Sequence, residues 1–345
     1  MTAKVYFKEF LKTPAETGQA SQAGRELLEM IIREEKLTLE KTVPLKVHFG
    51  EAGNLTYLKA ENYQGVIDYL RQGSIETCFI ETSALYSGRR KNRELHLKLA
   101  EEHGFRAVPI EIADGSAGEA FYEVQIRGKH FQKCRLGAGF AKYPQLLVLS
   151  HFKGHSLAGF GGAIKNLAMG FASKAGKLDQ HAASGPFIIP FLCKKCRACI
   201  FFCPVKAIKS GFFFKIDRQI CIGCAGCIPI CPKGAIIPNF LNSFSRKFPE
   251  RLVEYAHAAH LGRRNVYLNF IINVTSTCDC VGRNMKPIAD DLGVLASLDP
   301  VAIDKASLDL LDKKAGKMLF KKNRQSLDYA ESLGMGSTKY ELVSI

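Results

Sequence analysis

The sequence predicts an α/β fold, a mostly parallel sheet with flanking helices, that a small α+β domain rich in cysteine interrupts. Strand-like and helix-like patterns alternate through residues 1–186 and again through residues 241–345. Between them, residues 187–240 contain the same cysteine motif twice. Because strands that alternate with helices build βαβ units around a largely parallel sheet, we expect one α/β body in two parts and one inserted domain.

Apolar residues at helical or strand-like spacing mark the elements of the first part of the body. We expect helices in QAGRELLEMIIREEKL, NYQGVIDYLRQGS and RELHLKLAEEHGF, near residues 22–37, 62–74 and 93–104. We expect strands in LKVHFGE, ETCFIETSAL and YPQLLVLSHF, near residues 45–51, 76–85 and 143–152.

The second part of the body continues the alternation. PERLVEYAHAAHL predicts a helix near residues 249–261, NVYLNFIINVTS a strand near residues 265–276, and LGVLASL a strand or a turn. The step Asp299-Pro300 then opens the helix VAIDKASLDLLDKKAG, with Asp299 as its N-cap and Asp304 in its first turns.

Two copies of one cysteine motif fill most of the inserted domain. CKKCRACIFFCPVKAI begins at Cys193, CIGCAGCIPICPKGAI begins at Cys221, and each position recurs 28 residues later. Each copy follows C-x2-C-x2-C-x3-C-P. Three thiolates spaced in this way surround one corner of a cubane iron–sulfur cluster, whereas a zinc ribbon needs only paired C-x2-C knuckles. We therefore expect a ferredoxin-like domain with two [4Fe-4S] clusters.

The fourth cysteine of each motif binds the other cluster in two-cluster domains. The expected ligands are Cys193, Cys196, Cys199 and Cys231 for the first cluster, and Cys203, Cys221, Cys224 and Cys227 for the second. A pair of zinc sites is one alternative, and clusters that only stabilise the fold are another. Because two oxygen-sensitive clusters are a costly way to fold so small a domain, electron transfer is the favoured interpretation.

Three basic side chains, Lys194, Lys195 and Arg197, lie in the first motif where the second has small or apolar residues. Positive charge beside a cluster stabilises its reduced state, so we expect the first cluster to have the higher reduction potential. The same side chains could form a docking patch for an acidic electron carrier such as a ferredoxin or a flavodoxin.

A second candidate site begins where the glycine-rich segment HFKGHSLAGFGGAIKNLAMG follows a predicted strand, because open α/β sheets bind ligands at the carboxyl ends of their strands. Its candidate ligands for an anion or a metal are His151, Lys153, His155 and Lys165. The glycines that would allow close backbone approach are Gly159, Gly161 and Gly162. The segment lacks the G-K-S/T of a Walker loop, and no dinucleotide fingerprint follows a strand, so neither flavin nor nicotinamide is expected.

Cys278 and Cys280 form a Cys-Asp-Cys sequence after an apolar strand, and both sulfurs would lie on one side if that strand continued. The pair could bind a metal or pass between dithiol and disulfide, although a disulfide between such near neighbours closes a strained ring. Two core cysteines that lie close by chance are the plain alternative. The candidate ligands of a mixed sulfur and imidazole site are His48, His151, His155, His181, Cys278 and Cys280. Each histidine taken alone is more often structural, and Cys78 and Cys134 are expected as buried fillers.

Several segments together resemble a known family. They are KVHFGEAGN, ADGSAG, SHFKGHSLAGFGGAIKNLAMGFASKAGKLDQH, the doubled cysteine motif, NFIINVT, CDC and LASLDPVAIDKASLDLL. In this order they resemble the family catalogued as domain of unknown function 362, in its iron–sulfur branch. The resemblance implies an α/β body interrupted by a two-[4Fe-4S] ferredoxin-type module, typical of anaerobic metabolism. Its motif positions fall on His48, His151, His155, Lys165, Asn166, Cys278 and Cys280. The glycine-rich stretch is also faintly similar to a loop of the nickel-pincer lactate racemase family.

Length, charge and hydropathy narrow the function classes. The chain of 345 residues carries a formal charge of +15. It has no apolar leader and no run of about 18 apolar residues, so we expect a cytoplasmic protein without a membrane span. The charge favours an acidic redox partner or a small anionic substrate, whereas a nucleic-acid partner would rest on charge alone and is not expected.

Two functions fit these observations. The first is a ferredoxin-linked oxidoreductase of unknown substrate, in which the clusters exchange electrons with a site in the α/β body. Its candidate catalytic residues are Cys278, Cys280, His151, His155 and Lys165. The second is a non-enzymatic electron carrier or docking protein for a partner redox enzyme, which needs no pocket.

Overall fold

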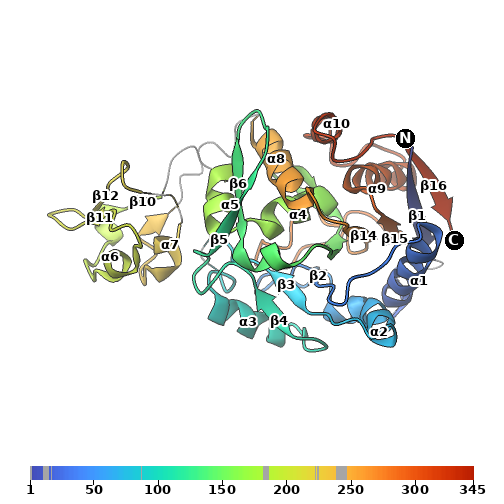
Figure 1. Cartoon of the computed structure of the whole chain (residues 1–345), viewed down its shortest axis with the longest axis horizontal. Helices are drawn as coiled ribbons and strands as arrows, with labels where there is room; N and C mark the ends of the chain where they lie inside the picture. The colour runs from blue at the N-terminus through green and yellow to red at the C-terminus, as the bar shows by residue number, and fades with distance from the viewer. Residues whose placement is uncertain are drawn as a thin grey trace.

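The computed structural model describes residues 2–10, 15–16, 18–86, 88–181, 186–221, 223, 225–237 and 247–345. Within these residues the body is built on one eight-stranded sheet, in the order β16-β1-β15-β14-β7-β2-β3-β4 (Figure 1). Its strands are β1 (Ala3–Glu9), β2 (Leu45–Lys46), β3 (Phe79–Glu81), β4 (Ile110–Ile112), β7 (Leu147–His151), β14 (Val266–Ile271), β15 (Gly293–Ser297) and β16 (Tyr340–Ser344). Five neighbouring pairs are parallel, and the two pairs that include β15 are antiparallel. The predicted α/β class is confirmed, with a mixed sheet.

Helices cover both faces of this sheet (Figure 1). On one face lie α1 (Gln19–Glu34), α2 (Gln64–Gln72) and α3 (Arg93–Glu102). On the other lie α4 (Ala163–Phe171), α8 (Phe248–His260), α9 (Pro300–Ala315) and α10 (Ser326–Ser332). Successive side chains of a strand point to opposite faces, so β7 contributes Leu147 and Leu149 to the first core and Val148 to the second.

Two hairpins and a further helix complete the body. They are β5 (Phe121–Gln125) with β6 (Lys133–Gly137), β8 (Lys153–His155) with β9 (Gly159–Gly161), and α5 (Lys174–His181). In the described part of the body, two short 3-10 helices are η1 (Ala60–Tyr63) and η2 (Ala138–Lys142), and a third, η3 (Pro190–Leu192), lies in the cysteine-rich segment. No described helix is both long enough and apolar enough to cross a bilayer.

The glycine-rich segment is a hairpin followed by a helix, which corrects the expected loop. Gly159 has φ +88°, and a Cβ there would clash with the carbonyl oxygen of Lys322. A Cβ on Gly162 would clash with the Asp304 carboxylate. That carboxylate accepts hydrogen bonds from the first two backbone N–H groups of α4, at 2.7 and 3.0 Å. These two glycines therefore allow Lys322 and Asp304 of the protein to approach closely. Asp304 of α9 occupies the helix terminus that an anion could have used.

The cysteine-rich segment lies at one end of the molecule (Figure 1). Its described elements are β10 (Phe187–Ile188) paired with β13 (Ile236–Ile237), β11 (Ile208–Lys209) paired with β12 (Lys215–Ile216), α6 (Ala198–Phe202) and α7 (Cys227–Ile230). A small apolar core contains Cys199, Ile208, Phe214 and Ile236, and it includes Leu85 and Leu178 of the body. The segment therefore packs directly on the body.

Several predicted elements are present with different ends. The helix expected over residues 22–37 is α1, and Asp299 caps α9 as predicted by accepting hydrogen bonds from Val301 and Ala302 at 2.8 Å. The strand expected over residues 45–51 is only two residues long. The strand expected over residues 265–276 ends at Ile271, so the Cys-Asp-Cys sequence lies in a loop.

Candidate functional site

A cavity of about 220 Å³ lies at the carboxyl ends of the parallel strands β2, β3 and β7. The polar residues on its wall include Lys46, His48, Glu81, Arg90, His155 and Lys165. Apolar side chains, among them Leu85, Leu157, Met169 and Phe248, form the rest. This is the edge of the sheet where the sequence predicted a ligand site.

A buried ion network holds one wall of the cavity in place. The Glu81 carboxylate lies 3.0 Å from Lys46 Nζ and 3.2 Å from an Arg90 nitrogen, and Arg90 also lies 3.4 Å from Glu51. Burial alone would raise the pKa of Glu81, but Lys46 and Arg90 lower it to about 2. This network was not predicted from the sequence. Lys46 within the predicted apolar strand of residues 45–51 was the available signal, because a buried charge requires a partner.

Lys165, on α4, faces the cavity without an ion-pair or hydrogen-bond partner among the described residues. Burial, with a smaller contribution from the Lys153 charge, lowers its pKa to about 7. Lys177 of α5 also lines the cavity, and its Nζ donates to Thr82 Oγ1 at 2.5 Å and to the Ala172 carbonyl at 2.8 Å. With Lys46 and Arg90 against Glu81, these amines give the wall of the cavity an excess of basic groups, a charge that favours anions.

Cys278 and Cys280 are joined by a disulfide, with their Cα atoms 5.4 Å apart. The carboxylate of the intervening Asp279 points away into the protein, where it lies 2.7 Å from Lys153 Nζ and 3.0 Å from His151 Nδ1. Burial would raise the pKa of Asp279, but His151 and Lys153 lower it below its usual range. Both cysteines were predicted as site residues from the sequence, whereas Asp279 between them was not.

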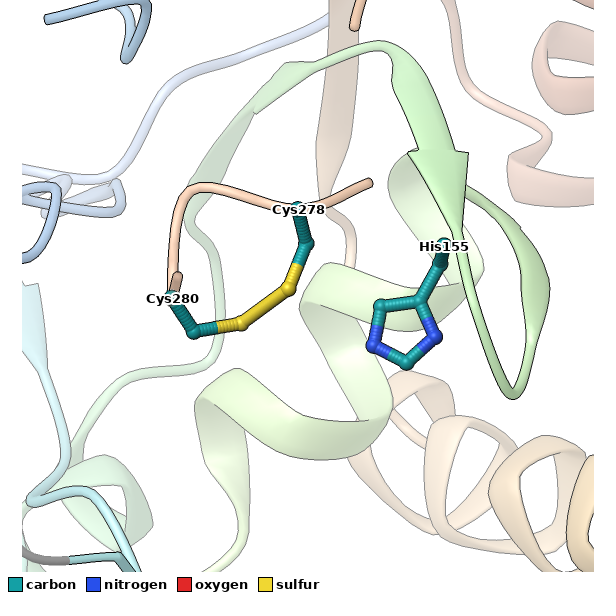
Figure 2. Close-up of side chains that lie close together, drawn as sticks. All are labelled: His155, Cys278 and Cys280. Atoms are coloured by element: carbon teal, nitrogen blue, oxygen red, sulfur yellow. A yellow bond between two sulfur atoms is a disulfide. The ribbon is translucent and has the colours of Figure 1, made fainter. Parts of the chain in front are cut away.

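His155 lies beside the disulfide (Figure 2). A ring nitrogen and the two sulfurs lie within 4.8 Å of one another, a group that could hold a metal ion when the disulfide is reduced to thiolates. His155 Nδ1 accepts backbone hydrogen bonds from Leu157 at 3.2 Å and Ala158 at 2.9 Å. Burial holds the pKa of His155 well below its usual value. The ring is therefore neutral, and its single proton lies on Nε2.

The other candidate histidines are placed differently. His151 Nε2 lies 2.6 Å from the Ile272 carbonyl, so both of its ring nitrogens already face acceptors. His48 Nδ1 accepts the Gly50 N–H at 3.0 Å, and burial lowers its pKa well below the usual value. Burial lowers the pKa of His181 to about 4. His48, His155 and His181 line the cavity together with Cys280 and Lys165, whereas His151 holds Asp279.

Three more predicted residues lie outside this group. The Asn166 side chain accepts from Lys46 Nζ at 2.9 Å and donates to Ser150 Oγ at 3.1 Å. Cys134 is fully buried on β6, as expected of a filler, and Cys78 is only partly buried.

The cysteine-rich segment brings together the four residues predicted to bind the first cluster. Cys193, Cys196, Cys199 and Cys231 line one small cavity, and Lys194 and Arg197 also border it. Backbone N–H groups donate to sulfur, from Ala207 to Cys203 at 3.3 Å and from Ala235 to Cys231 at 3.2 Å. Hydrogen bonds to thiolate sulfur suit an iron–sulfur site. Of the residues expected to bind the second cluster, Cys224 lies outside the described residues.

The sequence of the chain matches one known protein family. The family model described as Domain of unknown function (DUF362) matches residues 43–309. The chain belongs to this family. None of the curated proteins matches the chain in sequence.

Two solved structures share a remote likeness with the DUF362 chain. A protein from Thermotoga maritima has 10% identity and a TM-score of 0.42, over 92% of this chain and 60% of its own. The lactate racemase apoprotein from Thermoanaerobacterium thermosaccharolyticum has 10% identity and a TM-score of 0.38, over 77% of this chain and 50% of its own. The chain thus spans about half to three fifths of these neighbours.

Proposed function

We propose that this DUF362 protein is an iron–sulfur redox protein in which an inserted domain, residues 187–240, exchanges electrons with the cavity of the α/β body, residues 1–186 and 241–345. The observation that carries the proposal is a residue that belongs both to the cavity and to the core of the cysteine-rich segment. Leu85 lines the cavity and is also part of the small apolar core around Cys199. Leu85 thus joins the wall of the cavity to the core of the cysteine-rich segment.

The eight motif cysteines would hold two [4Fe-4S] clusters. Cys193, Cys196, Cys199 and Cys231 fit the first, because all four border one cavity and the pKa of Cys199 is raised by burial and by the three other sulfurs. Cys203, Cys221, Cys224 and Cys227 are the proposed ligands of the second. When bound, the clusters supply electrons one at a time at a potential set by their surroundings.

The cavity residues would bind and orient a small anionic substrate. Lys165 is the amine with no other partner in the described part of the chain, and Arg90 and Lys177 add positive charge. Leu157 and Phe248 add apolar surface to the wall, and a lower local dielectric strengthens charge–charge contacts. His155 presents a proton on Nε2 toward the disulfide.

Purification without oxygen, with iron and sulfide analysis and electron paramagnetic resonance of the reduced protein, tests the clusters. We expect about eight irons per chain. Four irons or fewer in a folded, anaerobic sample would contradict the assignment. A further stoichiometric metal that disappears in the C278S/C280S variant would instead place a metal at His155 and the two cysteines.

A role as an electron carrier alone is the second candidate, and the surface of the inserted domain favours it. Residues 187–237 contain eight Lys or Arg side chains and one acidic side chain. Phe191, Phe201 and Phe212 are 95%, 83% and 82% exposed. If this role is the correct one, charge reversal at Lys194, Lys195 and Arg197 weakens an acidic carrier complex with a steep salt dependence, and C278S/C280S is silent.

A further inference from the structure

The backbone around the Cys278–Cys280 disulfide is held by contacts that do not involve sulfur. The Asp279 carboxylate is fixed by Lys153 and His151. The backbone carbonyl of Asp279 accepts a hydrogen bond from the Glu51 N–H at 3.1 Å. The Val281 carbonyl accepts from Asn54 Nδ2 at 3.1 Å. Because none of these contacts uses the S–S bond, we expect the two thiols to remain opposite each other when that bond opens.

The two sulfurs differ in their access to the cavity. Cys280 is partly exposed and lines the large cavity beside Lys165, whereas Cys278 is 5% exposed and does not line it. A ring nitrogen of His155 lies within 4.8 Å of both sulfurs. The arrangement therefore provides one sulfur on the wall of the 220 Å³ cavity, one that borders only a smaller neighbouring cavity of about 40 Å³, and a neutral N–H beside them.

We propose that Cys280 and Cys278 form a thiol–disulfide exchange centre for small anionic disulfides. In the dithiol form, Cys280 as thiolate attacks one sulfur of the substrate, whose S–S bond breaks and whose other half leaves as a thiol after taking a proton. Cys278 then attacks the Cys280 sulfur, releases the second thiol and restores the protein disulfide. The substrate gains two electrons and two protons, and the protein dithiol is oxidised. A small dithiol reductant, which becomes a cyclic disulfide, returns the protein to its starting state.

The charge of the cavity selects the substrate. Lys46, Arg90, Lys165 and Lys177 outnumber Glu81 on its wall, so a carboxylate near the reacting sulfur is favoured and an ammonium group is disfavoured. The inference rests on the cavity of the proposed function and does not depend on the clusters.

A matched series of disulfides tests the proposal on the full chain reduced with dithiothreitol. The probes are 3,3′-dithiodipropionate, 2-hydroxyethyl disulfide and cystamine, which carry negative, neutral and positive end groups. We expect the anionic probe to react at least about tenfold faster than the cationic one. The variant K165M should narrow this ratio, and K314M, at an exposed position of α9, should leave it unchanged. Equal rates for the three probes would overturn the anionic preference.

Trapping experiments test the order of the two cysteines. C278S should accumulate a mixed disulfide on Cys280 that intact mass spectrometry detects as one added half of the probe, and C280S should accumulate little. The reverse pattern, or free thiols at both Cys278 and Cys280 in the oxidised wild-type protein, would overturn the proposal. Iron, sulfide and paramagnetic resonance report on the clusters separately, so a chain with eight irons and no exchange refutes this inference alone.

Discussion

Two groups of cysteines in this chain are held in opposite ways. The loop at Cys278 and Cys280 lies at the carboxyl edge of the sheet and is fixed by the buried contacts of Asp279 with Lys153 and His151. The motif cysteines lie in a segment whose described strands have two residues each. The small core of this segment includes Leu85 and Leu178 of the body. The first site is formed by the fold, whereas under the proposed function the second would depend on the clusters that its cysteines hold.

Loss of a motif cysteine should therefore unfold the segment and leave the body intact, the largest effect we expect. In C199S we predict loss of about half of the iron and rapid proteolysis within residues 187–237. The thermal transition of the body should not move. Iron analysis and limited proteolysis measure the effect, with C78S as the matched control; unchanged iron in C199S would refute the assignment.

Asp279→Asn should damage the body instead, because it leaves Lys153 buried without its counter-charge. Removing one partner of a buried ion pair costs about 3–5 kcal/mol of unfolding free energy. The control is D309N, which breaks the partly exposed pair between Lys305 and Asp309 and should cost less than about 1 kcal/mol. Denaturant unfolding compares them, and equal losses would mean that the loop is not fixed by Asp279.

Acid should destabilise the body through Glu81. The ordinary pKa of a glutamate is 4.5, whereas the pKa of Glu81 in the folded chain is about 2, so the folded state binds fewer protons than the unfolded one. The stability that this carboxylate provides is complete above pH 4.5 and is lost as the pH falls toward 2. Between pH 4.5 and pH 2, the unfolding free energy of the wild type should fall more steeply with decreasing pH than that of E81Q. An identical slope in the two proteins would contradict the depressed pKa.

Lys165 should give the smallest effect. Its pKa of about 7 means that its positive charge is lost as the pH rises through neutrality. Calorimetry with 3,3′-dithiodipropionate and the unreactive C278S/C280S variant should show affinity that falls by up to about tenfold from pH 6 to pH 8. The added K165M substitution should flatten this dependence; a dependence that survives it belongs to another group.

Long, periodic or capped elements of the fold could be predicted from the sequence. The apolar spacing of α1 and the Asp299-Pro300 cap of α9 were sufficient. The strands β2 and β3 could not be delimited, because buried strands of two or three residues show no alternation. The edge strand β16 was missed because it exists by pairing with β1 from the other end of the chain.

The residues of the candidate site could be predicted from the sequence by their type, but the contacts between them could not. The sequence indicated Cys278, Cys280, His155 and Lys165, all of which border the cavities at the carboxyl edge of the sheet. It could not indicate that His151 meets Asp279, because 128 positions separate them and only the parallel pairing of β7 with β14 brings them together.

The parallel pairing of β1 with β16 has a practical consequence. Both ends of the chain lie along one margin of the sheet, and the cysteine-rich segment lies at the opposite end of the molecule (Figure 1). A peptide handle joined to either end would attach the molecule to an electrode or a bead by that margin. Lys194, Lys195 and Arg197 would then face the solution, where a soluble electron donor could reach them.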